Sequence, residues 1–256
     1  MNFQNLRLDV DGRIAHLTLA RSRRLNALSK DLLREVVAAC EEVNRSDDVR
    51  VMVVSGEGTS FSAGFDLSDF ASGDTNPRES ADLGRLATEA LTDVRALTIA
   101  AISGHCVGGG LVLAGACDLR VAASDVRFSI PEVDLGIPLA WGGIPRLVRE
   151  IGPALTKELV LTCRPFGADE AKSIGFLNEV VAPDRVMSRA GELARSLADK
   201  PRYALTVTKQ QVNAVMEEIA GTGRNTTDAE VLVFAMRDPE SREASRRFLE
   251  ARSRPR

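Results

Sequence analysis

The chain has 256 residues, of which 44% are hydrophobic and 27% charged, and its formal net charge is −3. The length suits one large domain with a terminal extension, and no apolar run approaches the roughly 20 residues of a membrane span. Nothing in the charge favours nucleic acid, and two histidines leave little material for a metal site or a Ser-His-Asp triad. We therefore expect a soluble protein that needs no metal, nucleic acid or membrane.

The N-terminal residues lack the basic segment, apolar stretch and small-residue cleavage site of a secretory signal, which predicts a cytoplasmic protein. The cysteines are scattered among apolar or small neighbours without paired spacing. We interpret them as buried free thiols: Cys40, Cys106, Cys117 and Cys163.

Strands and helices alternate in the first half of the chain. Residues 6–20 alternate apolar and polar side chains around a central glycine, which is typical of a β-hairpin. Apolar residues recur at helical spacing over 29–44, and the nearly all-apolar run 49–55 predicts a strand buried on both faces. The pattern recurs loosely, with a strand predicted over 97–102, a helix over 111–117 and a strand over 118–123.

Residues 71–80 are rich in Gly, Pro and small polar side chains, and we interpret them as a surface loop without regular structure that could act as a lid. After Trp141 the pattern is almost wholly helical, with Pro153, Asp184 and Pro201 near helix starts. The sequence thus predicts an α/β fold with a helical C-terminal region.

Two glycine-rich turns follow predicted strands. Residues 55–67 read SGEGTSFSAGFDL, and residues 102–120 read ISGHCVGGGLVLAGACDLR. Neither fits the dinucleotide fingerprint, the phosphate loop or the nucleophile elbow. Such turns expose backbone N–H groups, so one N–H from each would form an oxyanion hole. The alternative is that these glycines only allow helices and strands to pack closely.

Glu132 lies inside the otherwise apolar run FSIPEVDLGIPLAWGG. Burial there would raise its pKa, as suits a proton shuttle, and the alternative is a glutamate on a half-exposed turn. Trp141, the only tryptophan, either lines a pocket or fills the core. The other acidic residues near these motifs have structural rather than catalytic roles. We expect Asp66 to cap the helix after the first turn and Asp118 to tether the start of a strand.

Several motifs in register extend over nearly the whole chain: ARSRRLNAL, GEGTSFSAGFDL, GHCVGGGLVLAGACD, PEVDLGIP and ADEAKSIGFLNEV. Their order resembles the enoyl-CoA hydratase/isomerase (crotonase) family. The resemblance implies a crotonase-like spiral of repeated strand-strand-helix units over residues 1–183, holding the acyl-CoA site, and a helical trimerisation region over 184–256. It also implies a homotrimer or dimer of trimers and an acyl-CoA thioester substrate, with coenzyme A as part of the substrate and no separate cofactor.

The same resemblance assigns roles to single residues. Phe65 and Gly109 would supply the two backbone N–H groups of the oxyanion hole, with Glu132 as the catalytic carboxylate. The Ala63 carbonyl would lie near the adenine amine of the coenzyme A portion of the substrate, which makes Ala63 the expected cofactor-binding residue.

Basic side chains are expected near the coenzyme A phosphates. Arg23 or Arg24 stands where the family commonly has such a residue, although each could equally belong to a solvated turn. The tail helix is expected to pack on a neighbouring subunit. Further candidates are Lys209, Arg246 and Arg247, for which a solvated basic face is the alternative.

Val112 departs from the hydratase pattern. Hydratases of the family have a second glutamate two residues after the third glycine of the G-G-G run, and this chain has Val112 there. Valine can neither orient nor deprotonate water. We therefore expect an enoyl-CoA isomerase that shifts a C3 double bond to C2 with Glu132 alone, in a pocket lined by Val112 and Trp141. The alternatives are an enoyl-CoA hydratase with weak or unusual activity, another lyase or decarboxylase of the family, and a catalytically lapsed acyl-CoA-binding protein.

Overall fold

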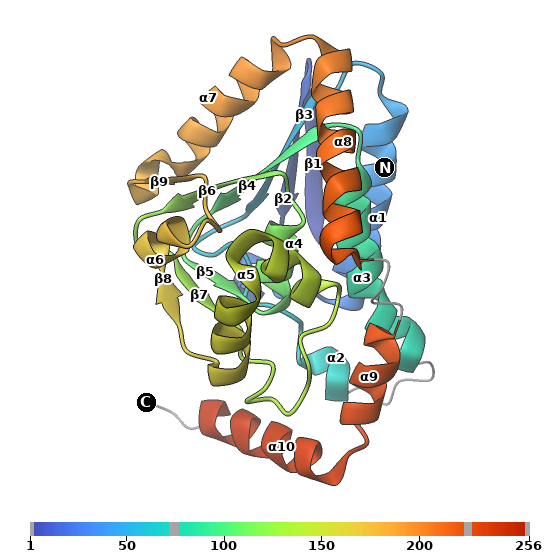
Figure 1. Cartoon of the computed structure of the whole chain (residues 1–256), viewed down its shortest axis with the longest axis vertical. Coiled ribbons are helices and arrows are strands. Elements are labelled where there is room, and N and C mark those ends of the chain that lie inside the picture. The colour runs from blue at the N-terminus through green and yellow to red at the C-terminus, as the bar shows by residue number, and fades with distance from the viewer. Residues whose placement is uncertain (1–2, 72–76, 223–226, 254–256) are drawn as a thin grey trace.

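A six-stranded, mostly parallel sheet forms the centre of the fold, with a smaller three-stranded sheet beside it (Figure 1). The computed structural model describes residues 3–71, 77–222 and 227–253. The large sheet has the order β1-β2-β3-β4-β6-β9, and its strands are β1 (Leu6–Asp11), β2 (Ile14–Leu19), β3 (Val51–Gly56), β4 (Leu97–Ile102), β6 (Leu119–Ala123) and β9 (Glu179–Val181). The small sheet has the order β5-β7-β8, with β5 (His105–Val107), β7 (Arg127–Ser129) and β8 (Phe166–Gly167).

The N-terminal hairpin predicted over residues 6–20 is confirmed. β1 and β2 pair antiparallel, and the pairing of Asp11 with Ile14 leaves Gly12 and Arg13 in the turn. Gly12 has a φ of +57°, in the left-handed region that glycine adopts without steric cost. β2 then pairs parallel with β3, which joins the hairpin to the rest of the sheet.

The chain then winds through repeated units in which one strand enters the large sheet and the next enters the small sheet. β4 and β5 precede α4 (Gly109–Gly115), and β6 and β7 precede α5 (Gly143–Thr162). This arrangement is the predicted spiral of strand-strand-helix units. Because each unit turns from one sheet to the other, the connections after β3 and β5 come to lie side by side.

The large sheet is buried on both faces, as the apolar run 49–55 predicts. Successive side chains of a strand point to opposite faces. Val51 and Val53 therefore pack against α7 (Val186–Ala198), whereas Met52 and Val54 belong to the larger core that also contains residues of α1 (Lys30–Arg45) and α3 (Pro77–Asp93). All four cysteines are buried and unpaired, as predicted.

One prediction about local structure was wrong. Residues 71–80 were expected to have no regular structure, but α2 (Ser68–Ala71) ends at 71 and α3 begins at Pro77; residues 72–76 lie outside the described ones. Pro77 favours rather than breaks this helix, because a proline at the first helical position has no N–H that needs an intrahelical acceptor. The described region after Trp141 is almost wholly helical, as predicted. Its strands β8 and β9 are too short to produce a readable periodicity.

The remaining helices follow the second sheet and are α6 (Ala168–Ser173), α7, α8 (Arg202–Ala220), α9 (Asp228–Ala235) and α10 (Pro239–Ser253). α9 packs on α3, and α10 contacts the loop that carries Glu132, since Ser245 Oγ donates to the Leu135 carbonyl at 2.5 Å. Within the chain, the tail helix thus packs beside its own candidate site. The division at residue 183 stays a prediction.

α8 is tied to the large sheet by a buried ion pair. Lys209 Nζ lies 2.9 Å from Asp118 Oδ2 and donates to the Ala96 carbonyl at 3.0 Å. Asp118 also accepts from the N–H and the hydroxyl of Thr98, which confirms the predicted tether at the strand start. Lys209 is therefore neither a solvated cation nor a group available to coenzyme A, and its expected role was wrong.

Lys209→Met is expected to lower the free energy of unfolding by about 3–5 kcal/mol, because it leaves the Asp118 carboxylate without its cation in a largely buried position. Urea unfolding of the variant measures the change. Lys157→Met on α5 is the control, since Lys157 is exposed and its replacement should change stability by less than about 0.5 kcal/mol. Equal stabilities of the two variants would contradict the proposed tether.

Candidate functional site

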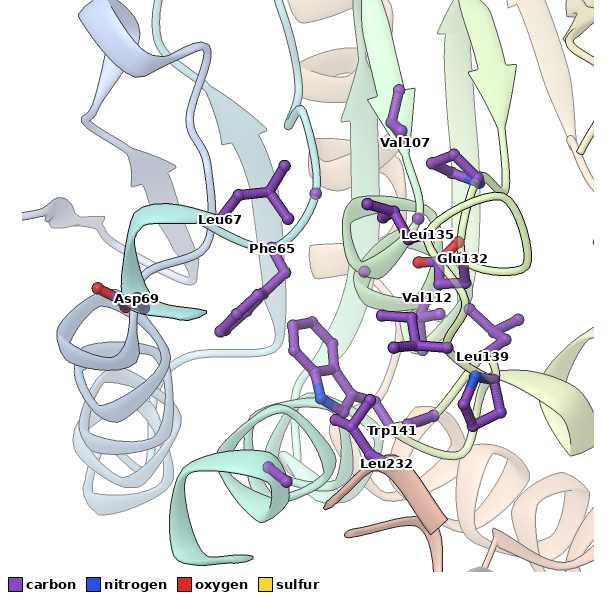
Figure 2. A pocket seen from close by; sticks show the side chains of 18 of the residues that line it. Phe65, Leu67, Asp69, Val107, Val112, Glu132, Leu135, Leu139, Trp141 and Leu232 are labelled. Atoms are coloured by element: carbon purple, nitrogen blue, oxygen red, sulfur yellow. The ribbon is translucent and has the colours of Figure 1, made fainter. Parts of the chain in front are cut away.

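An open pocket lies where the two glycine turns meet the loop that follows β7 (Figure 2). Its wall is mainly apolar. Among the described residues, the titratable side chains that line it belong to Lys30, Asp69 and Glu132. Figure 2 shows Asp69 beyond Phe65, on the opposite side of the pocket from Glu132.

Buried polar contacts fix the first glycine turn, after β3. Asn26 is fully buried, and its Nδ2 donates to the carbonyls of Glu57 and Ser60 at 2.9 and 2.7 Å. Asp66 accepts from the N–H and hydroxyl of Ser68, capping α2 as predicted, and also pairs with Arg21 at 2.8 Å. Burial opposes ionisation of Asp66, but these bonds outweigh it and hold the pKa of its carboxyl below the ordinary value.

The second glycine turn lies directly against the first. Ser62 N–H donates to the His105 carbonyl at 3.0 Å, and Val107 N–H donates to the Ser62 carbonyl at 3.0 Å. A Cβ placed on Gly64 would come within 2.8 Å of the Val107 carbonyl oxygen. The close approach therefore requires glycine at position 64, where φ is +91°.

The backbones of Phe65 and Gly109 suit the oxyanion-hole role. Phe65 pairs with Leu28 in a parallel bridge, closed by bonds to the peptide groups on either side of Phe65, so its own N–H points away from Leu28. Gly109 is the first residue of α4, and its N–H has no acceptor within the helix. Both residues line the pocket.

Glu132 lies against the same turn. A Cβ on Gly108 would be 2.3 Å from Glu132 Oε1, so the carboxylate occupies the space that glycine leaves open. Glu132 Oε2 is buried and has no hydrogen-bond partner among the described residues. Burial raises the pKa of Glu132 to about 7. The group is therefore near the middle of its titration at neutral pH, as a proton shuttle requires.

The other predicted site residues divide into two groups. Ala63, Val112 and Trp141 line the pocket. Trp141 is also only 6% exposed. It therefore both lines the pocket and fills the core, the two interpretations that its sequence left open.

The predicted basic residues lie elsewhere. Arg23 and Arg24 are exposed on η1 (Ser22–Arg24) and do not line the pocket. On α10, Arg246 forms ion pairs with Glu243 and Glu250, and Arg247 lies 4.0 Å from Glu243.

Several pocket residues were missed, and two of them come from a distant part of the chain. Leu232 of α9 and Met236 just after it line the pocket, 100 and 104 residues beyond Glu132. The apolar residues of α9 lie on more than one face, with Val231 and Phe234 exposed and Leu232 buried, so no stripe marks its inner face. Only the packing of α9 on α3 identifies which side faces the pocket.

The described residues contain no cluster of three or more His, Cys, Asp or Glu side chains suited to a metal ion. Within the same residues, no helix combines the length and the apolar character needed to cross a membrane.

Comparisons with known proteins agree with this geometry. A family model described as enoyl-CoA hydratase/isomerase matches residues 9–255. The chain is 36% identical to a short-chain-enoyl-CoA hydratase of Clostridium acetobutylicum over 85% of this chain and 84% of that one. It is 34% identical to a crotonyl-CoA hydratase of Syntrophomonas wolfei over 98% and 97% of the two chains.

A solved structure of an enoyl-CoA hydratase from Geobacillus kaustophilus superimposes with a TM-score of 0.80 at 34% identity, covering 99% of this chain and 98% of that one. The predicted crotonase-like α/β fold is thereby confirmed. The chain belongs to the enoyl-CoA hydratase/isomerase family of enzymes, which act on acyl-CoA thioesters.

Proposed function

We propose that the enzyme shifts the C3 double bond of a 3-enoyl-CoA to C2, with Glu132 as the only proton shuttle. One observation supports this most directly. The buried side chain of Val112 stands where a hydratase has its second glutamate, and the other described carboxylate that lines the pocket, Asp69, lies on the opposite side from Glu132 (Figure 2). Moving one proton needs one base, whereas adding water needs a second polar group to hold the water.

The thioester oxygen would accept hydrogen bonds from the N–H groups of Phe65 and Gly109. Glu132 takes a proton from C2, and the electrons of the C2–H bond form the dienolate, whose charge rests on the thioester oxygen. Each donor of such a hole contributes a factor of about 10²–10³ in rate. The protonated Glu132 then returns the proton to C4, which leaves the double bond between C2 and C3 and restores the carboxylate.

Remote parts of coenzyme A would bind at the mouth of the pocket. We assign the adenine amine to the Ala63 carbonyl, since Ala63 lines the pocket and its own N–H is held by the Leu25 carbonyl at 2.9 Å. Arg23 and Arg24 precede Leu25 on an exposed turn, from which long side chains would reach the phosphates.

Hydration of a 2-enoyl-CoA is the second candidate, because the relatives at 36% and 34% identity are named hydratases. The two reactions separate in one spectrophotometric experiment. Incubation with a 3-enoyl-CoA should raise the ultraviolet absorbance of the conjugated thioester, whereas hydration of a 2-enoyl-CoA should lower it. If hydration is faster, the isomerase proposal is wrong; if acyl-CoA binds and neither signal changes, the chain is a binding protein.

The value of kcat/KM for the double-bond shift is expected to rise with pH through a midpoint near 7. Burial raises the pKa of Glu132 to about 7, and the carboxyl must be ionised to accept the C2 proton. It is therefore protonated and inactive below this value, and active above it. A profile from about pH 5 to about pH 9 measures the midpoint. A midpoint near 4.5, the ordinary value, would contradict the desolvated site.

We also propose that the enzyme is a homotrimer or a dimer of trimers. Val212, Val215 and Ile219 share one face of α8 and are between 51% and 72% exposed, which is unusual for an apolar row on an isolated subunit. Light scattering after size exclusion should give three or six times 27.6 kDa. A mass of 27.6 kDa would contradict the assembly.

A further inference from the structure

Trp141 fills the space between α3 and α4 with its indole ring. A Cβ on Gly84 of α3 would lie 1.9 Å from Trp141 Cε2, and a Cβ on Gly109 of α4 would lie 2.3 Å from Trp141 Cζ3. The ring of Phe65 meets the indole edge to face, with centroids 5.8 Å apart. Only glycine at positions 84 and 109 leaves room for this side chain.

The backbone of Trp141 is held in a conformation that bulky residues rarely adopt. Its φ is +62°, in the left-handed region. The Trp141 carbonyl accepts from Thr88 Oγ1 at 3.0 Å and from Arg146 Nη1 at 3.3 Å. The next N–H, that of Gly142, donates to Asp228 Oδ2 at 2.9 Å. Contacts from α3, α5 and α9 therefore fix the backbone of Trp141 in this conformation, and the close contacts with Gly84 and Gly109 confine its ring.

The indole stands beside the reacting centre. Gly109, whose N–H is assigned to the thioester oxygen, is in contact with the ring, and Figure 2 shows Trp141 between Phe65 on one side and Val112 and Glu132 on the other. The indole is therefore a rigid aromatic wall beside Gly109. On the side of α3 the ring lies directly against Gly84, so this side of the wall is filled by protein.

We propose that Trp141 is the end wall of the acyl pocket and restricts the enzyme to short acyl chains. One methylene more or less in a hydrophobic pocket changes selectivity by about 10–200-fold. The measurement of kcat/KM rests on the proposed function, because it requires the double-bond shift. The measurement of Kd for saturated acyl-CoAs requires only that the protein binds acyl-CoA.

Trp141→Ala and the milder Trp141→Phe test the end wall. The kcat/KM of each variant is measured with 3-enoyl-CoA substrates of about four to about ten carbons, and the Kd is measured for saturated acyl-CoAs of the same lengths. We expect the ten-to-four-carbon ratio of either quantity to shift toward the longer chain by at least about 10-fold in Trp141→Ala. Trp141→Phe should give a smaller shift in the same direction. If the alanine variant does not fold, the phenylalanine variant decides the test.

Phe176→Leu is the matched control. Phe176 is a fully buried aromatic residue that packs on Phe128 and does not line the pocket. This variant should lose stability and keep the wild-type chain-length ratio. An unchanged ratio in both Trp141 variants would overturn the proposal. If the wild type shows no isomerisation, the proposed function fails, and the Kd ratios still decide whether Trp141 limits chain length.

Discussion

Glu132→Gln is expected to lower kcat for the double-bond shift by about 10³-fold or more, since an amide cannot accept the C2 proton and general acid-base catalysis contributes about 10²–10⁴-fold. Binding of acyl-CoA should persist, because glutamine has the same shape and the oxyanion hole is built from backbone. The Kd of a saturated acyl-CoA, measured by calorimetry, should change by less than about threefold. A loss of kcat without a loss of affinity identifies an interaction made only in the transition state.

Asp134→Asn is the control for Glu132→Gln. Asp134 lies two residues after Glu132 on the same loop and is exposed. It therefore carries a carboxylate as Glu132 does, but outside the buried position beside the second glycine turn. Its replacement should leave kcat within about twofold, as is usual for surface changes. A Glu132→Gln variant that keeps more than about a tenth of the activity, or an Asp134→Asn variant that loses as much, would refute the lone-shuttle mechanism.

The sequence predicted the parts of the fold whose periodicity spans several residues. The hairpin of β1 and β2, the strand β4 at residues 97–102 and the helix after the three glycines all occur where the pattern placed them. β3 was recognised because both of its faces are buried, so nearly every residue is apolar. Two-residue and three-residue strands such as β8 and β9 have no periodicity to detect.

The candidate site was predictable where local sequence dictates the chemistry. Glu132 stood out as a carboxylate directly after a proline in a mainly apolar run, and the glycines marked turns that expose N–H groups. Tertiary contacts were not predictable in the same way. The burial of Lys209 depends on Asp118, which is 91 residues earlier in the chain, and the pocket contacts of Leu232 depend on how α9 packs on α3.

Gly108→Ala is expected to lower kcat by at least about 100-fold, because it displaces both the Glu132 carboxylate and the N–H of Gly109. The new methyl group would lie 2.3 Å from Glu132 Oε1 and 3.1 Å from its Cδ, so the carboxylate must move. Gly108 has a φ of +49° and a ψ of −120°, outside the regions allowed to L-residues, and such strain costs alanine about 1–3 kcal/mol. Any relaxation re-aims the adjacent N–H of Gly109. Steady-state kinetics and urea unfolding together measure the two effects.

Gly12→Ala separates backbone strain from displacement of the carboxylate. Gly12 has a similar φ of +57°, but nothing lies within 4 Å of a Cβ placed there, and it sits in the turn between β1 and β2. Both variants should lose stability through backbone strain, by about 1–2 kcal/mol in Gly12→Ala and by about 1–3 kcal/mol in Gly108→Ala, while only Gly108→Ala should lose activity. If Gly108→Ala loses stability as Gly12→Ala does and keeps its kcat, then Glu132 does not need its position against the second turn, and the proton shuttle must be sought elsewhere in the pocket.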